Sequence, residues 1–538
     1  MYKSLTFFFL LLFLVIGSSY LCAKTQVVIR QESGIEHVLK GRDKKFIIKA
    51  DIDLNGRTVK VGKDCSFDFK GGSFSNGTII GDKTIVCSTQ KNVFHNCLII
   101  GDWLVDVAYS TMFDDELNAL ILLKNMSCLS SVLRLSANRV YLIDSGGESI
   151  DVKIIESIGN EKPLIVFHTT VPNVSGIQLY GDIVTLRNLS IKDDYNPNND
   201  AIYGQNDVTK GNTISVFSRR KVVNKLLIEN CDFSGGTSSS YIASSQIRDC
   251  EINNCRFSGY IADHAVYCSK KTVSFLVNQC ELRNIIETRS VFKVRSSIEL
   301  KKFSLCNINA HNLNGYMAQV SLLETPLCEL MFNNIKLTKD PNNDSVFYGF
   351  CLNDETRNNH MIGYNAKDIT INNCHFTYGY NGNALLYEGA GTRARVATVK
   401  YVKSLAVSSN FSGCVSDQVI VSQCTFSDCC NINKKGMALM TRSLSIDNTT
   451  ISDNKTGIHN CLFLINYSKQ LLESIRMNKV SVGANVNRLF DITKGKGLSI
   501  IMRDCEVSSI EKELLRSPSS CFVSFNKDKC IVNNKIDK

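Results

Sequence analysis

Residues 226–233 read Leu-Leu-Ile-Glu-Asn-Cys-Asp-Phe, and this phrase decides the fold because it returns along much of the chain. Its next two copies centre on Cys255 and Cys280, at intervals of about 25 residues. A fixed period of this length is typical of a solenoid. The interval between Cys374 and Cys424 is twice as long, which predicts two periods. Further copies centre on Leu189, Cys306, Ile335, Cys374, Cys424, Thr449, Val480 and Cys505.

Apolar residues alternate within each copy, and Val, Ile and Phe dominate, so each copy has the periodicity and composition of a β-strand. No helical pattern separates the copies. A strand that returns every 25 residues or so stacks in parallel on the preceding one, at about 4.8 Å per coil. The sequence therefore predicts an all-β fold, a single-stranded right-handed parallel β-helix. Each coil should contain about three short strands and three turns.

Stacking places equivalent repeat positions in columns, so the cysteines at the centre of the phrase should form one ladder. A buried cysteine behaves as a small apolar residue, which predicts free, inward-facing thiols. The alternative is a disulfide framework, which 22 cysteines in an exported chain would also suggest. The Asn residues before the ladder position, such as Asn230 and Asn254, should occupy turns and pair with stacked neighbours.

The N-terminus predicts export. Lys3 precedes an apolar run from Phe7 to Ile16, and small and polar residues follow, which is the pattern of a signal peptide over residues 1–23. We therefore expect a secreted, periplasmic or cell-surface protein without a transmembrane segment. Cys22 raises the question of lipidation, although the bulky Leu21 before it disfavours a lipid-attachment signal.

The formal net charge of +10 is spread along the chain without a basic run, which argues against nucleic acid as a partner. A mildly basic surface suits an anionic polysaccharide. A charge that serves solubility alone explains the same composition.

Residues 24–143 are predicted to form an N-terminal cap and the first coils, and residues 144–538 the β-helix. The phrases at 53–58 and 67–79, with Gly101-Asp102-Trp103 and Phe113-Asp114-Asp115, resemble the opening of secreted bacterial proteins of the pectate-lyase-like superfamily. The resemblance implies that the Asp pair opens a short capping helix, expected over 114–124, and that an apolar strand follows at 139–143.

The same resemblance implies work on a polysaccharide, in particular an acidic, uronate-containing glycan. Two chemistries are open, and so is the question of whether the protein is an enzyme at all. A polysaccharide lyase needs a base and a cation that neutralises the uronate. An inverting glycoside hydrolase needs two carboxyl groups about 6.5–9.5 Å apart, one of them protonated. The alternative is a non-catalytic cell-surface solenoid that binds glycans or acts in adhesion.

Residues that stand at equal distances before successive ladder positions should lie in one column, and this places several polar residues on one outward face. Ser269, Arg295 and Glu324 should share one column, and Tyr267 and Lys293 the neighbouring one. The alternative is an ordinary solvated face, with a surface ion pair between Arg295 and Glu324. In the predicted site, Lys293 is the base, Arg295 lowers its pKa, and Asp263 and His264 complete the catalytic set. The predicted substrate-binding residues are Tyr267, Arg220 and Glu324.

A second constellation lies in the polar segment 193–200, where Asp193, Asp194 and Asp200 follow a predicted strand. These carboxylates could bind Ca²⁺, or supply the acid and base of a hydrolase. A plain polar loop explains the same residues, because Asn-Pro-Asn-Asn is ordinary turn chemistry. No other cofactor is expected, since no zinc, phosphate-loop or nucleophile-elbow pattern is present.

Overall fold

The computed structural model describes most of the chain after the predicted signal peptide and divides it into two compact units. Unit 1 comprises the chain up to Arg139 together with Ile154–Gly159, and unit 2 comprises Val140–Lys153 and the chain from Asn160 onward. The described residues are 24–87, 89–144, 146–168, 175–195, 211–288, 290–296, 300–322, 328–338, 340, 347–353, 366–372, 375–377, 383–388, 406–407, 416–427, 437–438, 441–453, 459–466, 473–484, 486–494, 497–519 and 522–534.

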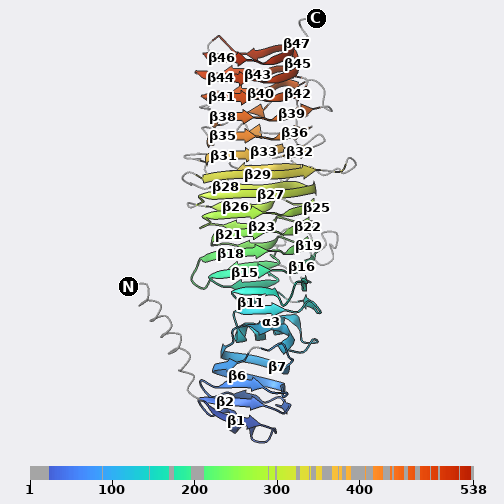
Figure 1. The fold of residues 1–538 in the computed structure, drawn as a ribbon, viewed down its shortest axis with the longest axis vertical. Coiled ribbons are helices and arrows are strands. Elements are labelled where there is room, and N and C mark those ends of the chain that lie inside the picture. Colours follow the sequence, from blue (N-terminus) through green and yellow to red (C-terminus); the bar gives the residue numbers. More distant parts are fainter. Residues whose placement is uncertain are drawn as a thin grey trace, which may run out of the picture. The chain divides into compact units, whose positions relative to one another are not determined.

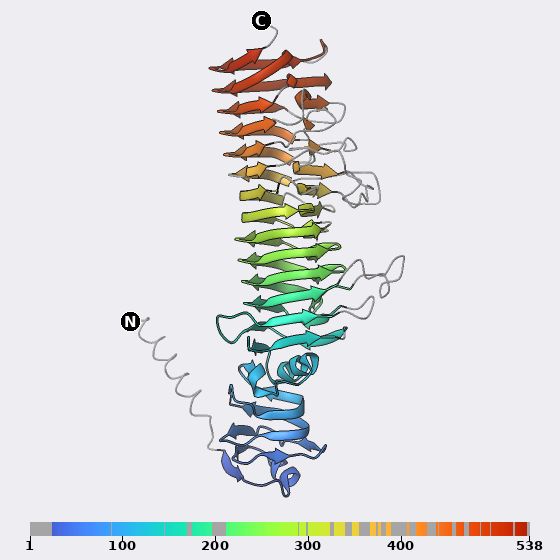
Figure 2. The ribbon, with the colours of Figure 1, turned by 90° about the vertical axis from the view of Figure 1, so that its right-hand side faces the viewer.

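Unit 2 is a parallel β-helix in which each coil contributes one strand to each of three sheets (Figures 1 and 2). The first sheet consists of β15 (Ile183–Arg187), β18 (Val223–Glu229), β21 (Ile247–Asn253), β24 (Ser274–Asn278), the first parts of β27 (Lys302–Leu313) and β29 (Cys328–Thr338), β31 (Ala366–Asn372), β35 (Ser416–Ser422), β38 (Thr441–Asp447), β41 (Ser474–Asn478), β44 (Leu498–Arg503) and β46 (Val523–Asp528).

The second sheet consists of β10 (Val140–Ile143), β13 (Leu164–Phe167), β16 (Ser190–Asp194), β19 (Asp232–Thr237), β22 (Arg256–Ile261), β25 (Glu281–Glu287), the second parts of β27 and β29, β32 (His375–Thr377), β36 (Thr425–Ser427), β39 (Thr450–Asp453), β42 (Ser481–Ala484), β45 (Glu506–Arg516) and β47 (Ile531–Asn534).

The third sheet consists of β11 (Glu148–Asp151), β14 (Ile177–Tyr180), β17 (Ile214–Phe217), β20 (Ser240–Ser244), β23 (His264–Ser269), β26 (Ser290–Ser296), β28 (Gly315–Leu322), β30 (Phe347–Asn353), β33 (Asn383–Glu388) and β34 (Ala406–Val407). Toward the C-terminus the third strand of the coil is β37 (Met437–Ala438), β40 (His459–Asn466) and β43 (Val486–Lys494). The predicted right-handed parallel β-helix is confirmed, with three strands per coil.

The turn between the first and second sheets carries the predicted column of left-handed residues. Asn230 and Asn254 have φ values of 52° and 53°. The side-chain amide of Asn254 donates to Oδ1 of Asn230 over 3.1 Å, and that of Asn230 donates to Oδ1 of Asn188 over 2.9 Å. Asn accepts this conformation at lower cost than most residues, and the stacked amides satisfy one another.

The ladder position follows that turn, and its cysteines are free and inward-facing as predicted. Cys231, Cys255, Cys280, Cys424 and Cys505 are buried and free. Cys306 was placed wrongly in the ladder. Asn307 takes the left-handed turn with φ 55°, so Ile308 occupies the ladder level and Cys306 lies two residues before it.

The long interval before Cys424 was also predicted wrongly. Asn372 of β31 pairs directly with Ser422 of β35, and His375 pairs with Thr425. The interval of about 50 residues is therefore one step in the first two sheets, although in the third sheet it contributes two paired strands, β33 and β34. A sequence period cannot distinguish two coils from one coil with an insertion of equal length.

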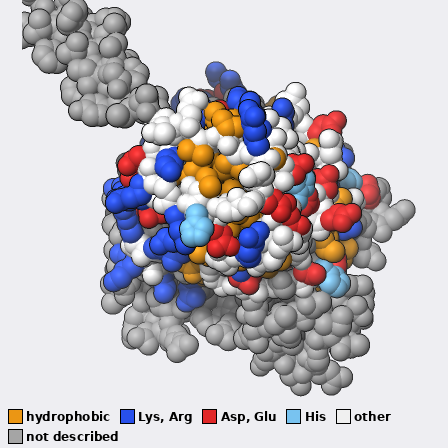
Figure 3. Space-filling model, turned by 90° about the horizontal axis from the view of Figure 1, so that it is seen from below, with side chains coloured by type: hydrophobic (Ala, Val, Ile, Leu, Met, Phe, Trp, Pro, Cys, Tyr) orange, Lys and Arg blue, Asp and Glu red, His pale blue; other side chains and the backbone are white. Residues whose placement is uncertain are grey.

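The described part of unit 1 begins with strand β1, which a short helix, α2, follows. The helix α2 buries Ile35 and Leu39, and β1 pairs with β2 as the first strand of its sheet. Seen from this end, apolar side chains lie in the middle of the view, with Lys and Arg gathered mainly to the left and Asp and Glu to the right (Figure 3). Charged side chains around an end strand discourage pairing with other chains.

The elements of unit 1 are β1 (Thr25–Ile29), α2 (Ile35–Leu39), β2 (Lys44–Ile48), β3 (Ile52–Asp53), β4 (Thr58–Lys60), β5 (Ser66–Phe69), β6 (Phe74–Val86), β7 (Phe94–Leu104), β8 (Ala108–Tyr109), a 3₁₀ turn (Ser110–Met112), α3 (Ala119–Leu129), β9 (Val132–Leu135) and β12 (Ile154–Ser157). No described helix is long and apolar enough to cross a membrane.

The capping helix expected over 114–124 lies further along the chain, as α3. Asn118 is its N-cap, and its side chain accepts hydrogen bonds from the backbone N–H groups of Leu120 and Ile121. Asp114 has a different task, because its carboxylate accepts from the side chain of Asn92 (3.0 Å) and the backbone N–H of Asn96 (2.6 Å).

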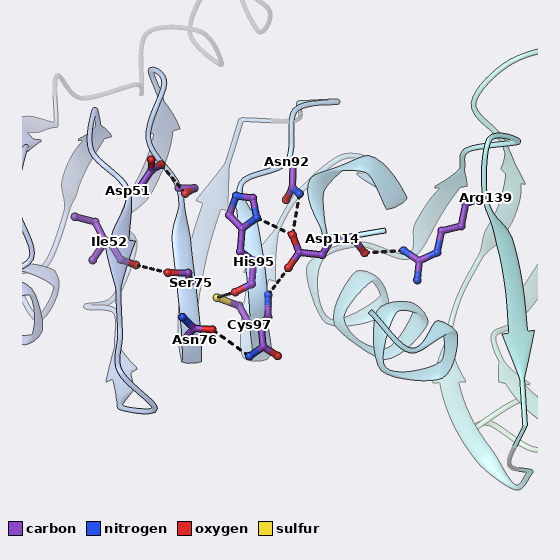
Figure 4. Close-up of polar contacts among 11 residues, drawn as sticks. Asp51, Ile52, Ser75, Asn76, Asn92, His95, Cys97, Asp114 and Arg139 are labelled. Atoms are coloured by element: carbon purple, nitrogen blue, oxygen red, sulfur yellow. Dashed lines mark hydrogen bonds and ion pairs between the residues drawn. The ribbon is translucent and has the colours of Figure 1, made fainter. Parts of the chain in front are cut away.

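The carboxylate of Asp114 also lies 2.6 Å from Nδ1 of His95, and Figure 4 shows Asp114 beside His95 and Asn92. Burial opposes the ionised form, but the bonds from Asn92, His95 and Asn96 together hold the pKa of Asp114 below its usual value. Arg139 donates to the backbone carbonyl of Asp114 over 2.7 Å. Asp114 therefore binds residues of a neighbouring turn and opens no helix here.

Candidate functional site

The third sheet brings three of the predicted site residues together. Tyr267 of β23 is paired with Lys293 of β26, and Ser269 with Arg295, which is the register that the sequence predicted. The ring of His264 lies 5.3 Å from the ring of Tyr267, measured between centroids. His264, Tyr267 and Lys293 therefore share one face of the solenoid.

This face is largely covered, which corrects the expectation of a solvated column. Lys293 is 3% exposed and His264 is 6% exposed, whereas Arg295 is exposed. Asp263, at the turn before β23, is half-buried, and its carbonyl accepts from the backbone N–H of Ser290 over 3.1 Å. Lys293 must therefore be treated as a buried residue in any variant.

His264 is held by Ser290, its neighbour on the next coil. Nδ1 of the imidazole lies 2.8 Å from the Ser290 hydroxyl oxygen and 3.2 Å from the Ser290 carbonyl oxygen. A hydroxyl can donate or accept, whereas a carbonyl oxygen can only accept, so both contacts are satisfied together when Nδ1 carries the hydrogen. In the neutral ring the lone pair then lies on Nε2, the nitrogen able to take a proton.

The two constellations that the sequence offered as competitors lie along one corner of the solenoid, where the chain passes from the second sheet to the third. The ring of Tyr195, next to Asp194, lies 5.8 Å from the ring of Tyr260, three residues before Asp263. Asp193 lies at the same corner, where its Oδ2 accepts a hydrogen bond from the Thr213 hydroxyl over 2.5 Å. We call this region the corner site and define it by Asp193, Tyr195, Tyr260, His264, Tyr267 and Lys293.

Asp193 and Asp194 point to opposite sides of β16, as successive strand residues do. Asp193 is 3% exposed, and burial raises its pKa to about 7, against the hydrogen bonds from Thr213 and the Tyr195 N–H. Asp194 is exposed and pairs with Nδ1 of His168, a hydrogen bond that raises the pKa of His168. The two carboxylates are thus not gathered around one point, and Asp200 lies outside the described residues.

Two predicted substrate-binding residues are not placed with the others. The sequence placed Arg220 in the column of Ser269, two coils before it, and the structure does not. Ser215 pairs with Ala243 and Ala243 with Tyr267, so the residue two coils before Ser269 is nearer to Ser215 in the chain than Arg220 is. Arg220 lies in a turn and forms an ion pair with Asp182 over 3.3 Å. The turn after β17 spans 218–222 and the equivalent turn after β20 only 245–246, so counting back across it loses the register.

Glu324 lies outside the described residues, and the residue paired with Arg295 on β28 is Ser321. The same strand brings in a residue that the sequence analysis missed, since Gln319 is paired with Lys293. The sequence could have indicated Gln319 only through its distance from the ladder position. Turns of different length had shifted that count, so another residue was assigned to the column.

These features define the class of the protein as a parallel β-helix with a polar corner. No family model matches the chain, and no curated protein matches its sequence. Among solved structures, the catalytic domain of a GH87 α-1,3-glucanase in complex with nigerose aligns with a TM-score of 0.38 at 10% identity, over 76% of this chain and 67% of that chain. A variant of such a domain in complex with tetrasaccharides aligns with a TM-score of 0.34 at 11% identity, over 73% and 63%. Such distant similarity carries no argument about activity.

Proposed function

We propose that the protein binds and cleaves a polysaccharide at the corner site, and that its substrate is a uronate-containing glycan broken by β-elimination. The observation that carries the proposal is the juxtaposition of His264, Tyr267 and Lys293 on one face. An imidazole, a phenol and an ammonium group on neighbouring strands supply a proton acceptor, a proton donor and a cation. Elimination from a uronate needs these three functions.

In the proposed step, His264 removes the proton from the carbon next to the uronate carboxylate. The electron pair forms a carbon–carbon double bond as the glycosidic carbon–oxygen bond breaks, and the Tyr267 hydroxyl protonates the leaving oxygen. Lys293 neutralises the carboxylate, which stabilises the charge that develops as the proton leaves. This assignment moves the base from Lys293, as first predicted, to His264, whose Nδ1 is already occupied by Ser290.

Hydrolysis receives less support from the corner site. An inverting hydrolase needs two carboxyl groups facing one substrate. Asp193 has the raised pKa of a general acid, but its side chain is buried and bonded to Thr213, while Asp194 faces the other side of the strand.

The second candidate function is non-catalytic glycan binding by a cell-surface solenoid. The burial of Lys293 and His264 favours it, because groups that are covered in the unbound protein are not presented to a long polymer. The two functions differ in turnover, so a product assay separates them.

The test is incubation of the protein with a panel of acidic and neutral polysaccharides. Elimination creates an unsaturated end that absorbs in the ultraviolet, whereas hydrolysis creates reducing ends alone. We expect ultraviolet-absorbing product with wild type, losses of at least about a hundredfold with His264→Gln and Lys293→Met, and full activity with Lys302→Met, an exposed lysine on β27. Binding without either product would replace the lyase by the non-catalytic solenoid, and reducing ends alone would replace it by a hydrolase.

A further inference from the structure

Gln319 is a buried polar side chain inside the proposed site. It lies on β28, paired with Lys293 of β26, and is 7% exposed. Its side-chain oxygen Oε1 is fully buried and finds no hydrogen-bond donor among the residues that the structure describes. A buried amide oxygen without a donor is costly, so such a group in a native protein needs an explanation.

The position of Gln319 suggests what the missing donor is. Paired strands of a sheet are about 4.8 Å apart, so the backbones of Gln319 and Lys293 are about that far apart, and their side chains can supply an acceptor and a cation to one sugar residue. A carboxylate and a ring hydroxyl of a single sugar residue are separated by a similar distance. One uronate can therefore contact both side chains.

We propose that Gln319 is a specificity-determining residue, whose amide oxygen accepts a hydrogen bond from a free hydroxyl of the uronate held by Lys293. This inference rests on the proposed function. It makes the preferred ligand a uronate with an unsubstituted hydroxyl. Acetylation of that hydroxyl removes the donor and adds bulk in a covered place, so it weakens binding.

Calorimetry with uronate oligosaccharides, with and without O-acetyl groups, tests the proposal. Wild type is expected to bind the unacetylated form at least about tenfold more tightly, and Gln319→Met to lose most of this preference. Gln178→Met is the matched control, because Gln178 lies in the same column of the third sheet and its Oε1 accepts from the Tyr180 hydroxyl. The control is expected to keep the preference.

Thermal unfolding without ligand gives a second readout. Gln319→Met removes an uncompensated buried oxygen at similar volume, so we expect Tm to rise by about 1–3 °C. A fall in Tm would show that the amide is bonded within the protein, which overturns the proposal. An unchanged acetyl preference in Gln319→Met would overturn the proposal while leaving the proposed function standing, whereas failure of wild type to bind any uronate would overturn both.

Discussion

His264 and Ser290 are neighbours on adjacent coils, and the imidazole Nδ1 contacts both the hydroxyl and the carbonyl oxygen of Ser290. With the hydrogen on Nδ1, the carbonyl oxygen remains as an acceptor when the hydroxyl is removed. We therefore expect Ser290→Ala to lower kcat less than about tenfold, whereas His264→Gln removes the base and costs about 10²–10⁴-fold. Steady-state kinetics on the cleaved glycan measure both. If Ser290→Ala is as damaging as His264→Gln, the hydroxyl itself takes part in the reaction.

The burial of Lys293 predicts that two substitutions differ in their effect on stability. Lys293→Ala leaves a hole among buried neighbours and should lower the free energy of unfolding by about 2–4 kcal/mol, while Lys293→Met keeps the volume and should cost less than about 1.5 kcal/mol. Urea unfolding measures the difference. Equal, negligible losses for both variants would mean that the side chain of Lys293 is exposed to solvent.

For the Asn column, we expect substitutions to lower the free energy of unfolding by an amount that depends on the backbone conformation of the new residue. Asn254 has φ 53° and bonds to Asn230, so Asn254→Ala should lower the free energy of unfolding by about 1–3 kcal/mol. Asn254→Gly loses the same hydrogen bond without the backbone strain, so it should be milder. Chemical denaturation of the two variants measures the difference between their free energies of unfolding. A glycine variant no better than the alanine variant would assign the whole effect to the amide.

Sequence reasoning succeeded where the repeat itself carries the information. The phrase around Cys231 predicted the parallel coils, the inward thiols and the turn of Asn230, because each follows from local periodicity. The pairing of Tyr267 with Lys293 was also predicted, but only because two errors cancelled: the count started from Cys306 instead of Ile308, and the segment from Arg295 to Lys302 is two residues longer than the segment from Ser269 to Ser274.

Sequence reasoning failed where turn length varies. Arg220 was misplaced because the turn after β17 is longer than the turn after β20, and Gln319 was overlooked for the same kind of reason. The burial of Lys293 could not be read from alternation either, because an outward-facing side chain becomes buried only when other parts of the chain cover it. The role of Asp114 depended on contacts across the turns of unit 1, which no local pattern encodes.

The free cysteines predict slow and uneven reactivity in the folded protein. Burial raises the pKa of Cys97 to about 12 and raises the pKa of Cys231 well above its usual value, so few thiolates are present to react. Cys87 is exposed and should react first. Titration with a thiol reagent, followed by mass spectrometry of peptides, measures the order, and Cys87→Ser should remove the fast phase. Blocked ladder cysteines in unfolded, unreduced protein would contradict free thiols.

Asp193 predicts how stability depends on pH at the corner site. Burial raises its pKa from 3.8 to about 7, so between about pH 4 and pH 7 the folded protein keeps a proton that the unfolded chain has released. The unfolded state binds fewer protons over this range, so the contribution of Asp193 to the free energy of unfolding falls as pH rises, and is constant above about pH 7. The full difference amounts to about 4 kcal/mol.

Asp193→Asn isolates this effect, because an amide can keep the contacts with Thr213 and the Tyr195 N–H but does not titrate. We expect the variant to be more stable than wild type at pH 8, with the advantage shrinking steadily toward pH 4. Asp194→Asn is the control, since Asp194 is exposed and should give no such trend beyond the small loss of its pair with His168. Urea unfolding at a series of pH values measures the slope. A constant difference between wild type and Asp193→Asn across the series would mean that the buried carboxyl titrates normally, and that the corner opens to water in solution.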